Sequence, residues 1–172
     1  MEPALIAIIG AVVGILLTNG IKLVLDARAR AEQVRDIQTA LRAEIRSHRR
    51  SLEVFLDEDR RNGVVTQILT ESGYSPFVPR EADAFIFSAV LGEIHILPGA
   101  VIDPVVLYYR QWHSLAALTD DMRSEPFYPL SPARKAAIYE DYAAMGAYAD
   151  ELARDAVAVI NRSLGNGGEA SI

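Results

Sequence analysis

Cysteine is absent from the 172 residues of this chain, which excludes intrachain disulfides and any site built on a thiolate. Other chemical patterns are missing too. The sequence contains no Gly-x-Ser-x-Gly elbow, no phosphate-cradling glycine loop and no His-Glu-x-x-His motif. We therefore predict no catalytic residue, no cofactor and no metal ligand, and we expect that the chain is not an enzyme.

Charge is absent from residues 3–21, a run of 19 residues. At 1.5 Å per residue, a helix of this length spans about 28 Å, and about 34 Å if it continues to Leu25 while Lys22 snorkels to the interface. Either length crosses a bilayer. The sequence thus predicts a single transmembrane anchor over residues 1–25. A cleaved signal peptide and a buried core helix are the alternatives, but the run lacks a basic leader and the rest of the chain offers little to surround it.

Basic residues follow this run and none precedes it. Lys22, Arg28, Arg30 and Arg35 lie within about 15 residues after the span. The positive-inside rule then places the N-terminus outside and the remaining chain in the cytoplasm. We expect a single-pass protein of a bacterial inner membrane.

Small residues form one face of the predicted anchor. Gly10 and Gly14 make a GxxxG pattern that allows another helix backbone to approach closely. The complete set is Ala7, Gly10, Ala11, Gly14 and Thr18. We predict helix packing through this face, with another copy or a different protein. The alternative is that glycine and alanine are simply common in transmembrane helices.

Glycine and proline are also missing between Ala27 and Arg60, which predicts one long helix there. An apolar stripe at spacings of three and four runs along it: Val34, Ile37, Leu41, Ile45, His48, Leu52 and Phe55. Breakers in residues 62–82 predict a connection with one short helical turn at 64–69. Residues 82–97 fit a buried helix or a strand, and we choose helix because no second β-rich run exists to pair with a strand.

Two further helices complete the predicted fold. One begins near Asp103-Pro104 and runs to Met122, and the other begins after Ser131 and stops at Gly165. The last helix carries a strict heptad stripe: Ile138, Tyr142, Met145, Ala149, Leu152, Ala156 and Val159. We predict that it packs antiparallel against the 27–60 helix. The fold class is therefore all-α, with an anchor, a bundle domain over residues 26–164 and a disordered tail over 165–172.

Three groups of side chains invite a functional interpretation. His48, His95 and His113 lack the spacing of known metal motifs, so we expect no shared metal site. Arg46, Arg49 and Arg50 lie too far from the predicted bilayer for headgroup contact, and we expect local ion pairs such as one to Glu53, or contact with an acidic partner protein. An aromatic group is assigned to the core rather than to an exposed partner-binding patch: Tyr108, Tyr109, Trp112, Phe127 and Tyr128.

The net charge of −6 disfavours nucleic-acid binding, which depends on neutralising phosphates. The coarse pattern resembles that of many small bacterial membrane-anchored proteins, and it carries no family motif. We expect a membrane-anchored helical scaffold or accessory protein whose partners are membrane lipid and another protein or itself. The alternative is a tethered sensor that holds a small ligand near Glu93, His95 and Tyr109.

Overall fold

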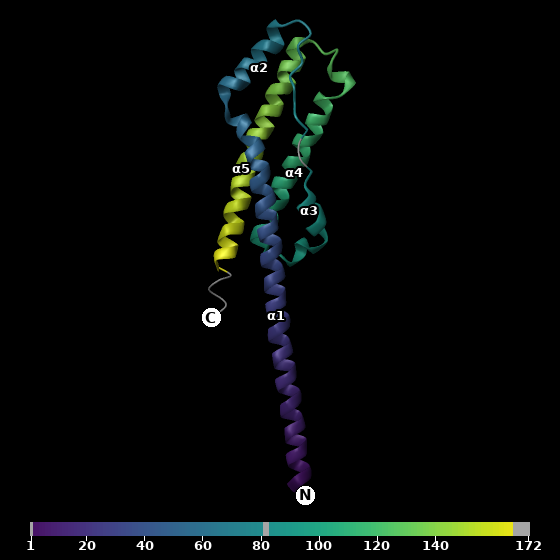
Figure 1. Ribbon diagram of the computed structural model, residues 1–172, viewed down its shortest axis with the longest axis vertical. Helices are drawn as coiled ribbons and strands as arrows, with labels where there is room; N and C mark the ends of the chain where they lie inside the picture. The colour runs from purple at the N-terminus through teal and green to yellow at the C-terminus, as the bar shows by residue number, and fades with distance from the viewer. Residues whose placement is uncertain (1, 81–82, 167–172) are drawn as a thin grey trace. The chain divides into compact units, whose positions relative to one another are not determined.

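The computed structural model describes the backbone of residues 2–80 and 83–166 and the side chains of residues 20–80 and 83–165. Within these residues every regular element is helical, which confirms the all-α class. The elements follow one another as α1 Glu2–Leu52, η1 Glu53–Leu56, α2 Glu58–Thr70, α3 Phe85–Val90, η2 Leu91–Ile96, α4 Gly99–Met122, η3 Glu125–Phe127 and α5 Pro132–Asn166 (Figure 1). The predicted tail lies outside the described residues from residue 167 onward.

The chain divides into two compact units, residues 1–37 and residues 38–172. The first unit consists of the N-terminal part of α1, whose helical backbone continues through Gly20. Its described side chains are exposed from Gly20 to Gln33. The second unit contains the remainder of α1 and all the other elements, and the hydrophobic core described below belongs to it.

The long helix ends earlier than the sequence predicts. Helix α1 stops at Leu52 instead of Arg60, and one short 3-10 turn leads to Asp57. The side chain of Asp57 accepts a hydrogen bond of 2.9 Å from the backbone N–H of Arg60, so it caps a new helix, α2. Helix α2 then runs through Gly63, where the sequence predicts mostly a connection. The prediction missed Asp57, which caps a new helix at a point where neither glycine nor proline marks the end of the previous one.

The core of the second unit lies between α4, α5 and residues 38–52 of α1. Side chains on the predicted α1 stripe are buried, including Leu41, Ile45 and Leu52, which are 0% exposed. The largest buried side chain, Trp112, comes from α4. Helices α4 and α5 lie side by side (Figure 1), and the Gln111 amide donates to the Met145 carbonyl across them at 3.1 Å.

Helix α5 pairs antiparallel with α1, as the two stripes predict. Gln38 near the start of this part of α1 bonds to Ser163 near the end of α5 at 3.0 Å. Further along α1, Arg49 meets Asp150, which lies closer to the start of α5. Residue numbers therefore increase along α1 as those of the contacting residues decrease along α5, which is the pattern of an antiparallel pair. Ser131 lies just before α5 and accepts a bond from the Arg134 N–H at 3.3 Å, as expected of its N-cap.

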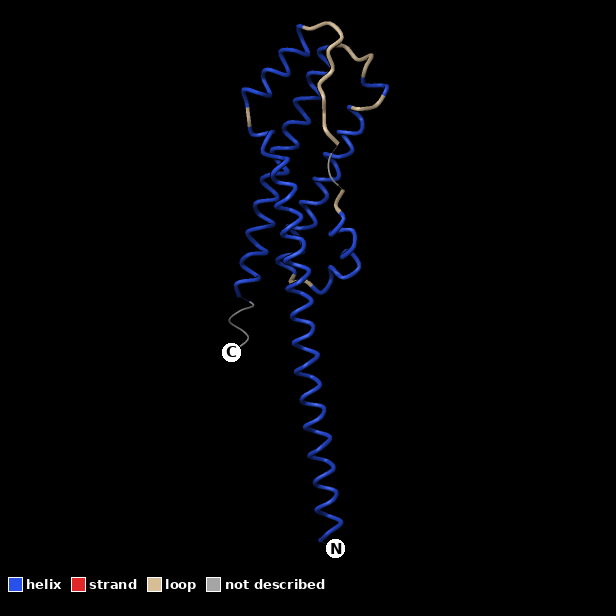
Figure 2. The backbone as a smooth tube through the Cα atoms, in the orientation of Figure 1, coloured by secondary structure: helices blue, strands red, loops and turns tan. Residues whose placement is uncertain are grey.

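Residues 71–80 after α2 and 83–84 before α3 are irregular and are drawn in tan in Figure 2. Two cations fasten residues 71–80 to the bundle: Arg123 donates to the Val78 carbonyl at 2.8 Å, and the buried Lys135 donates to the Ser75 hydroxyl at 2.9 Å. The following apolar segment is helical, as predicted, and divides into α3 and the 3-10 helix η2. This connection positions α3 against α1 and α4, where the most polar part of the core lies.

Candidate functional site

Glu44 of α1 is the centre of a buried polar cluster. Its side chain sits among core residues and only 7% of its surface is exposed. One carboxylate oxygen, Oε1, accepts from the Ile86 N–H at 2.7 Å, and the other, Oε2, accepts from the Phe87 N–H at 3.0 Å. The Tyr109 hydroxyl also donates to Oε2 at 2.6 Å. The carboxylate thus satisfies the free N–H groups at the start of α3 from a distant helix.

His48 lies one turn after Glu44 on the same helix and is 4% exposed. Its Nδ1 and the Tyr108 hydroxyl oxygen are 2.9 Å apart and share a hydrogen bond. The imidazole ring stacks on the Trp112 indole, with 4.1 Å between ring centroids and 3° between planes. A second stacked pair, Phe87 on Tyr109, closes the other side of the cluster at 4.0 Å.

Burial controls the protonation of this cluster. It lowers the pKa of His48 below its ordinary value of 6.5, and the nearby Glu44 carboxylate opposes that shift only in part. The pKa of Tyr109 is raised above its usual range by burial first and then by its hydrogen bond to Glu44. At neutral pH the cluster therefore contains a neutral His48 imidazole and a neutral Tyr109 phenol beside the acidic side chain of Glu44. Its hydrogen bonds join α1, α3 and α4, and this gives it a positioning role.

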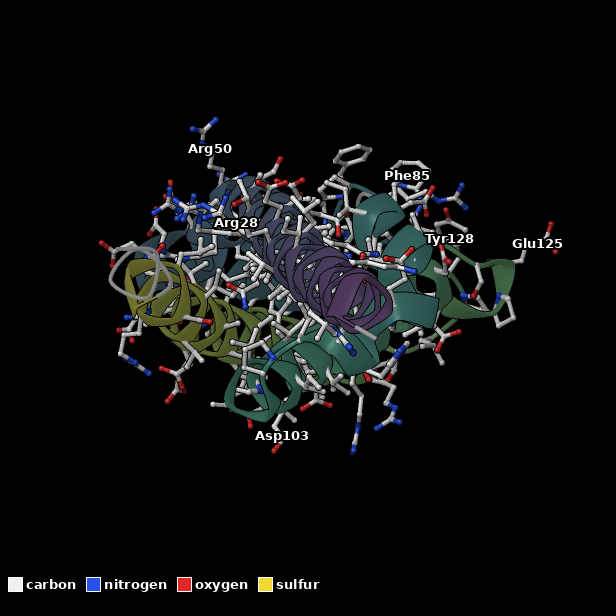
Figure 3. The ribbon with its side chains drawn as sticks, turned by 90° about the horizontal axis from the view of Figure 1, so that it is seen from below. Arg28, Arg50, Phe85, Asp103, Glu125 and Tyr128 are labelled. Carbon is white, nitrogen blue, oxygen red and sulfur yellow. The ribbon has the colours of Figure 1, made fainter. Side chains whose placement is uncertain are left out.

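A second buried acid, Asp150 of α5, is fully buried and holds two arginines. Its Oδ1 lies 2.8 Å from Nε of Arg49 on α1, and its Oδ2 lies 3.0 Å from Nε of Arg154. The local pairing expected for Arg49 was therefore wrong, because the preferred acid comes from another helix. Arg50 instead points outward at the edge of the molecule (Figure 3).

The three histidines lie in three different settings. His48 is buried in the cluster, His95 is exposed with Nδ1 3.1 Å from the Gly92 carbonyl, and His113 is exposed on α4. No group of three potential ligands is close enough to hold a metal ion among the described residues. Of the residues expected to surround a small ligand, Tyr109 is buried against Glu44, whereas Glu93 and His95 are exposed on η2.

The aromatic group divides between core and surface. The four residues Tyr108, Tyr109, Trp112 and Phe127 are buried, as the core interpretation predicts. Tyr128 is 57% exposed, so the prediction was wrong for this residue. Figure 3 labels Tyr128 and Phe85, two exposed aromatic side chains of the second unit.

Two of the hollows on the described surface of the second unit differ in the character of their lining. One has a volume of about 420 Å³ and mixes charge with aromatic rings. Its polar lining includes Arg80, Asp83, His113 and Asp120, beside Phe85 and Trp112. The other, about 1010 Å³, is a mainly apolar groove between α4 and α5. Neither was predicted from the sequence, since residues distant along the chain line both.

The predicted anchor face falls on Ala7, Gly10, Ala11, Gly14 and Thr18, whose side chains lie outside the described residues. Their backbone is helical, as part of α1. Among the residues that the structure describes, no helical stretch combines the length and the apolar character needed to cross a bilayer. The transmembrane span therefore remains a prediction, and the small-residue face remains one with it.

Sequence analysis alone missed the role of Glu44, although a glutamate one turn before a histidine on an apolar stripe was the available signal. Comparison with known proteins adds no further assignment: no family model matches the chain, and no similar curated protein or solved structure was found.

Proposed function

We propose that this chain is a membrane-anchored helical adaptor that acts by binding another protein and catalyses no reaction. One observation carries the proposal: Ile21, Leu23, Val24 and Leu25 are 54–70% exposed on a helix. Ile21 is the last residue of the uncharged run 3–21, and the other three follow it after Lys22. A helix with four large apolar side chains in five positions needs an apolar surrounding, and a lipid bilayer supplies one.

A binding role is supported by the way the core uses its polar groups. The Glu44 carboxylate accepts three hydrogen bonds, and Asp150 is held by two arginines. General acid or base catalysis requires a group that can reach a substrate proton, and these acids are already engaged inside the bundle. Their contacts instead fix the arrangement of α1, α3, α4 and α5, which is what a stable binding surface requires.

Alkaline carbonate extraction of membranes tests the anchor. The full chain should stay in the membrane pellet, because about 20 apolar residues resist extraction once inserted. The double variant Val12→Arg/Leu16→Arg should be released, since each central arginine costs about 2.5–3.5 kcal/mol of insertion energy. The matched control Leu56→Arg/Leu69→Arg alters two exposed side chains of the second unit and should stay in the pellet. Release of the unaltered chain would contradict the proposal.

A second candidate function is small-ligand binding in the 420 Å³ hollow. Its lining offers Arg80 for an anionic group, Asp83 for a cationic group, and the Phe85 ring for an apolar part. This combination suits a small zwitterion such as an aromatic amino acid. Trp112 is the single tryptophan and lines the hollow, so its emission is the readout. A saturable change on adding phenylalanine that Arg80→Gln abolishes favours this function, and an unchanged emission counts against it.

A further inference from the structure

Residues 24–36 of α1 arrange their charges by heptad position. The seam positions beyond the anchor, at spacings of four and three, are Ala27, Ala31 and Val34. All the basic residues in this stretch flank the seam, at the e and g positions: Arg28, Arg30 and Arg35. All the acidic residues lie on the opposite face: Asp26, Glu32 and Asp36. The stretch is thus a narrow apolar seam between two basic edges.

The seam is accessible and its edges are uncompensated. Ala27 and Ala31 are exposed, and Val34 is partly exposed. The guanidinium groups of Arg28, Arg30 and Arg35 are exposed and form no ion pair with any other residue that the structure describes. The seam residues Ala27 and Ala31 allow another helix to approach closely, because each presents only a methyl group.

We infer that residues 27–35 form a docking seam for an acidic amphipathic helix of a partner protein. The inference rests on the proposed adaptor role and specifies the partner's chemistry. Small apolar side chains on the partner would pack against Ala27 and Ala31. Glutamate or aspartate on both edges of the partner helix would pair with Arg28, Arg30 and Arg35.

A second copy of this chain does not suit the seam. In a parallel pair, g and e positions of neighbouring helices face one another, which places Arg30 against Arg35 of the other copy. In an antiparallel pair, e faces e and g faces g, so arginine again meets arginine. Either orientation is repulsive, whereas an acidic partner makes every edge contact attractive. The occupant is therefore a different, acidic helix.

The test uses designed peptides and the chain's lack of cysteine. The probe is a helix-forming peptide of three heptads with alanine and valine at its seam, one central seam cysteine and glutamate at both edges. A matched peptide carries lysine at the edges. The full chain in detergent micelles receives Ala31→Cys on the seam or, as the control, Ala29→Cys on the opposite face, both being exposed alanines. Mixed disulfides are then measured at equilibrium in a thiol redox buffer.

We expect Ala31→Cys to capture the glutamate peptide about tenfold more than the lysine peptide at low salt, because three edge contacts change sign between the two. Ala29→Cys should show less than about twofold preference. Adding Arg28→Gln and Arg35→Gln to Ala31→Cys should remove the preference. These results together would establish the seam and the charge of its partner.

Other outcomes overturn the inference. Equal capture of both peptides, or equal preference at Ala29→Cys, would mean that the seam has no selectivity. Chain-to-chain disulfides at Ala31→Cys that outcompete the peptide would assign the seam to a second copy. If the same arginines are needed for binding phosphatidylserine vesicles and no peptide preference is seen, their partner is lipid. Carbonate extraction does not depend on any of these results, so failure of the seam and failure of the anchor are separable.

Discussion

His48 and Trp112 stack face to face, with 4.1 Å between their ring centroids, in the interior of the second unit. The contact joins α1 to α4 and places a titratable ring beside the only tryptophan of the chain. A single fluorophore inside the core makes unfolding of this unit directly measurable. Unfolding of the full chain in detergent micelles can therefore be followed by the fluorescence emission of Trp112.

Stability of the second unit should fall as the pH drops below about 6.5. Burial lowers the pKa of His48 in the folded chain, so the unfolded chain takes up a proton that the folded chain refuses. The stability that arises from this difference in the pKa of His48 is fully present above the ordinary pKa of 6.5. It decreases as the pH falls from there toward the pKa of His48 in the folded chain. Below that folded-state pKa, titration of His48 changes the stability no further. Urea unfolding followed by Trp112 emission should show this decline, and the variant His48→Gln should show a weaker one. An equal decline in both chains would assign the pH dependence to other groups.

Replacing Glu44 by glutamine should destabilise the second unit by about 2 kcal/mol. The amide keeps one acceptor oxygen but presents an N–H₂ group to donors that now bond to the carboxylate: the Ile86 and Phe87 N–H groups and the Tyr109 hydroxyl. The urea midpoint should fall accordingly. Glu53→Gln, at an exposed position, is the matched control and should change stability by less than about 0.5 kcal/mol. Equal effects at both sites would show that the hydrogen bonds to the Glu44 carboxylate contribute nothing to stability.

Asp150→Asn should cost about 2 kcal/mol, because it removes the buried charge that holds Arg49 and Arg154. Arg154 is more than half exposed, so Arg154→Gln should cost only about 0.5 kcal/mol. Arg49→Gln combined with Asp150→Asn should cost less than the sum of the two single changes, since both break the same contact. Strict additivity in this double-mutant cycle would refute the coupling between α1 and α5.

Two glycine substitutions should act in opposite directions. A Cβ on Gly146 of α5 would collide with the ring of Phe55, which itself packs edge-on against Tyr142, so Gly146→Ala should destabilise by about 1–3 kcal/mol. A Cβ on Gly63 of α2 meets nothing within 4 Å. Gly63→Ala should therefore stabilise by about 0.5–1 kcal/mol through helix propensity. Stabilisation by both changes would mean that Phe55 does not pack closely on α5.

Sequence periodicity predicted the parts of this fold that depend on local pattern. The α5 start follows from Ser131 and Pro132, and the α1 stripe follows from apolar spacing, because both signals lie within one element. The end of α1 was misplaced because Asp57 acts through a cap, and a cap stops a helix without a glycine or proline. The α2 helix was underestimated because Gly63 lowers helix propensity by only about 1 kcal/mol and tertiary contacts outweigh it.

The candidate sites were less predictable, since they depend on contacts between distant residues. Glu44 meets Phe87, and Asp150 meets Arg49, across 43 and 101 positions of sequence. No short-range pattern marks such a pair. By contrast, the charge sorting over residues 24–36 is visible in the sequence once the heptad register is known, and the exposure of Ala27 and Ala31 shows that the seam is open.

Cysteine accessibility tests the anchor and its orientation most directly. The natural chain contains no cysteine, so Leu16→Cys in the uncharged run and Asp103→Cys on α4 each report one site. In inside-out vesicles, a membrane-impermeant maleimide should label Asp103→Cys at once and Leu16→Cys only after detergent is added. In intact cells it should label neither. Labelling of Leu16→Cys in sealed vesicles as fast as Asp103→Cys would contradict the membrane anchor on which the proposed function rests.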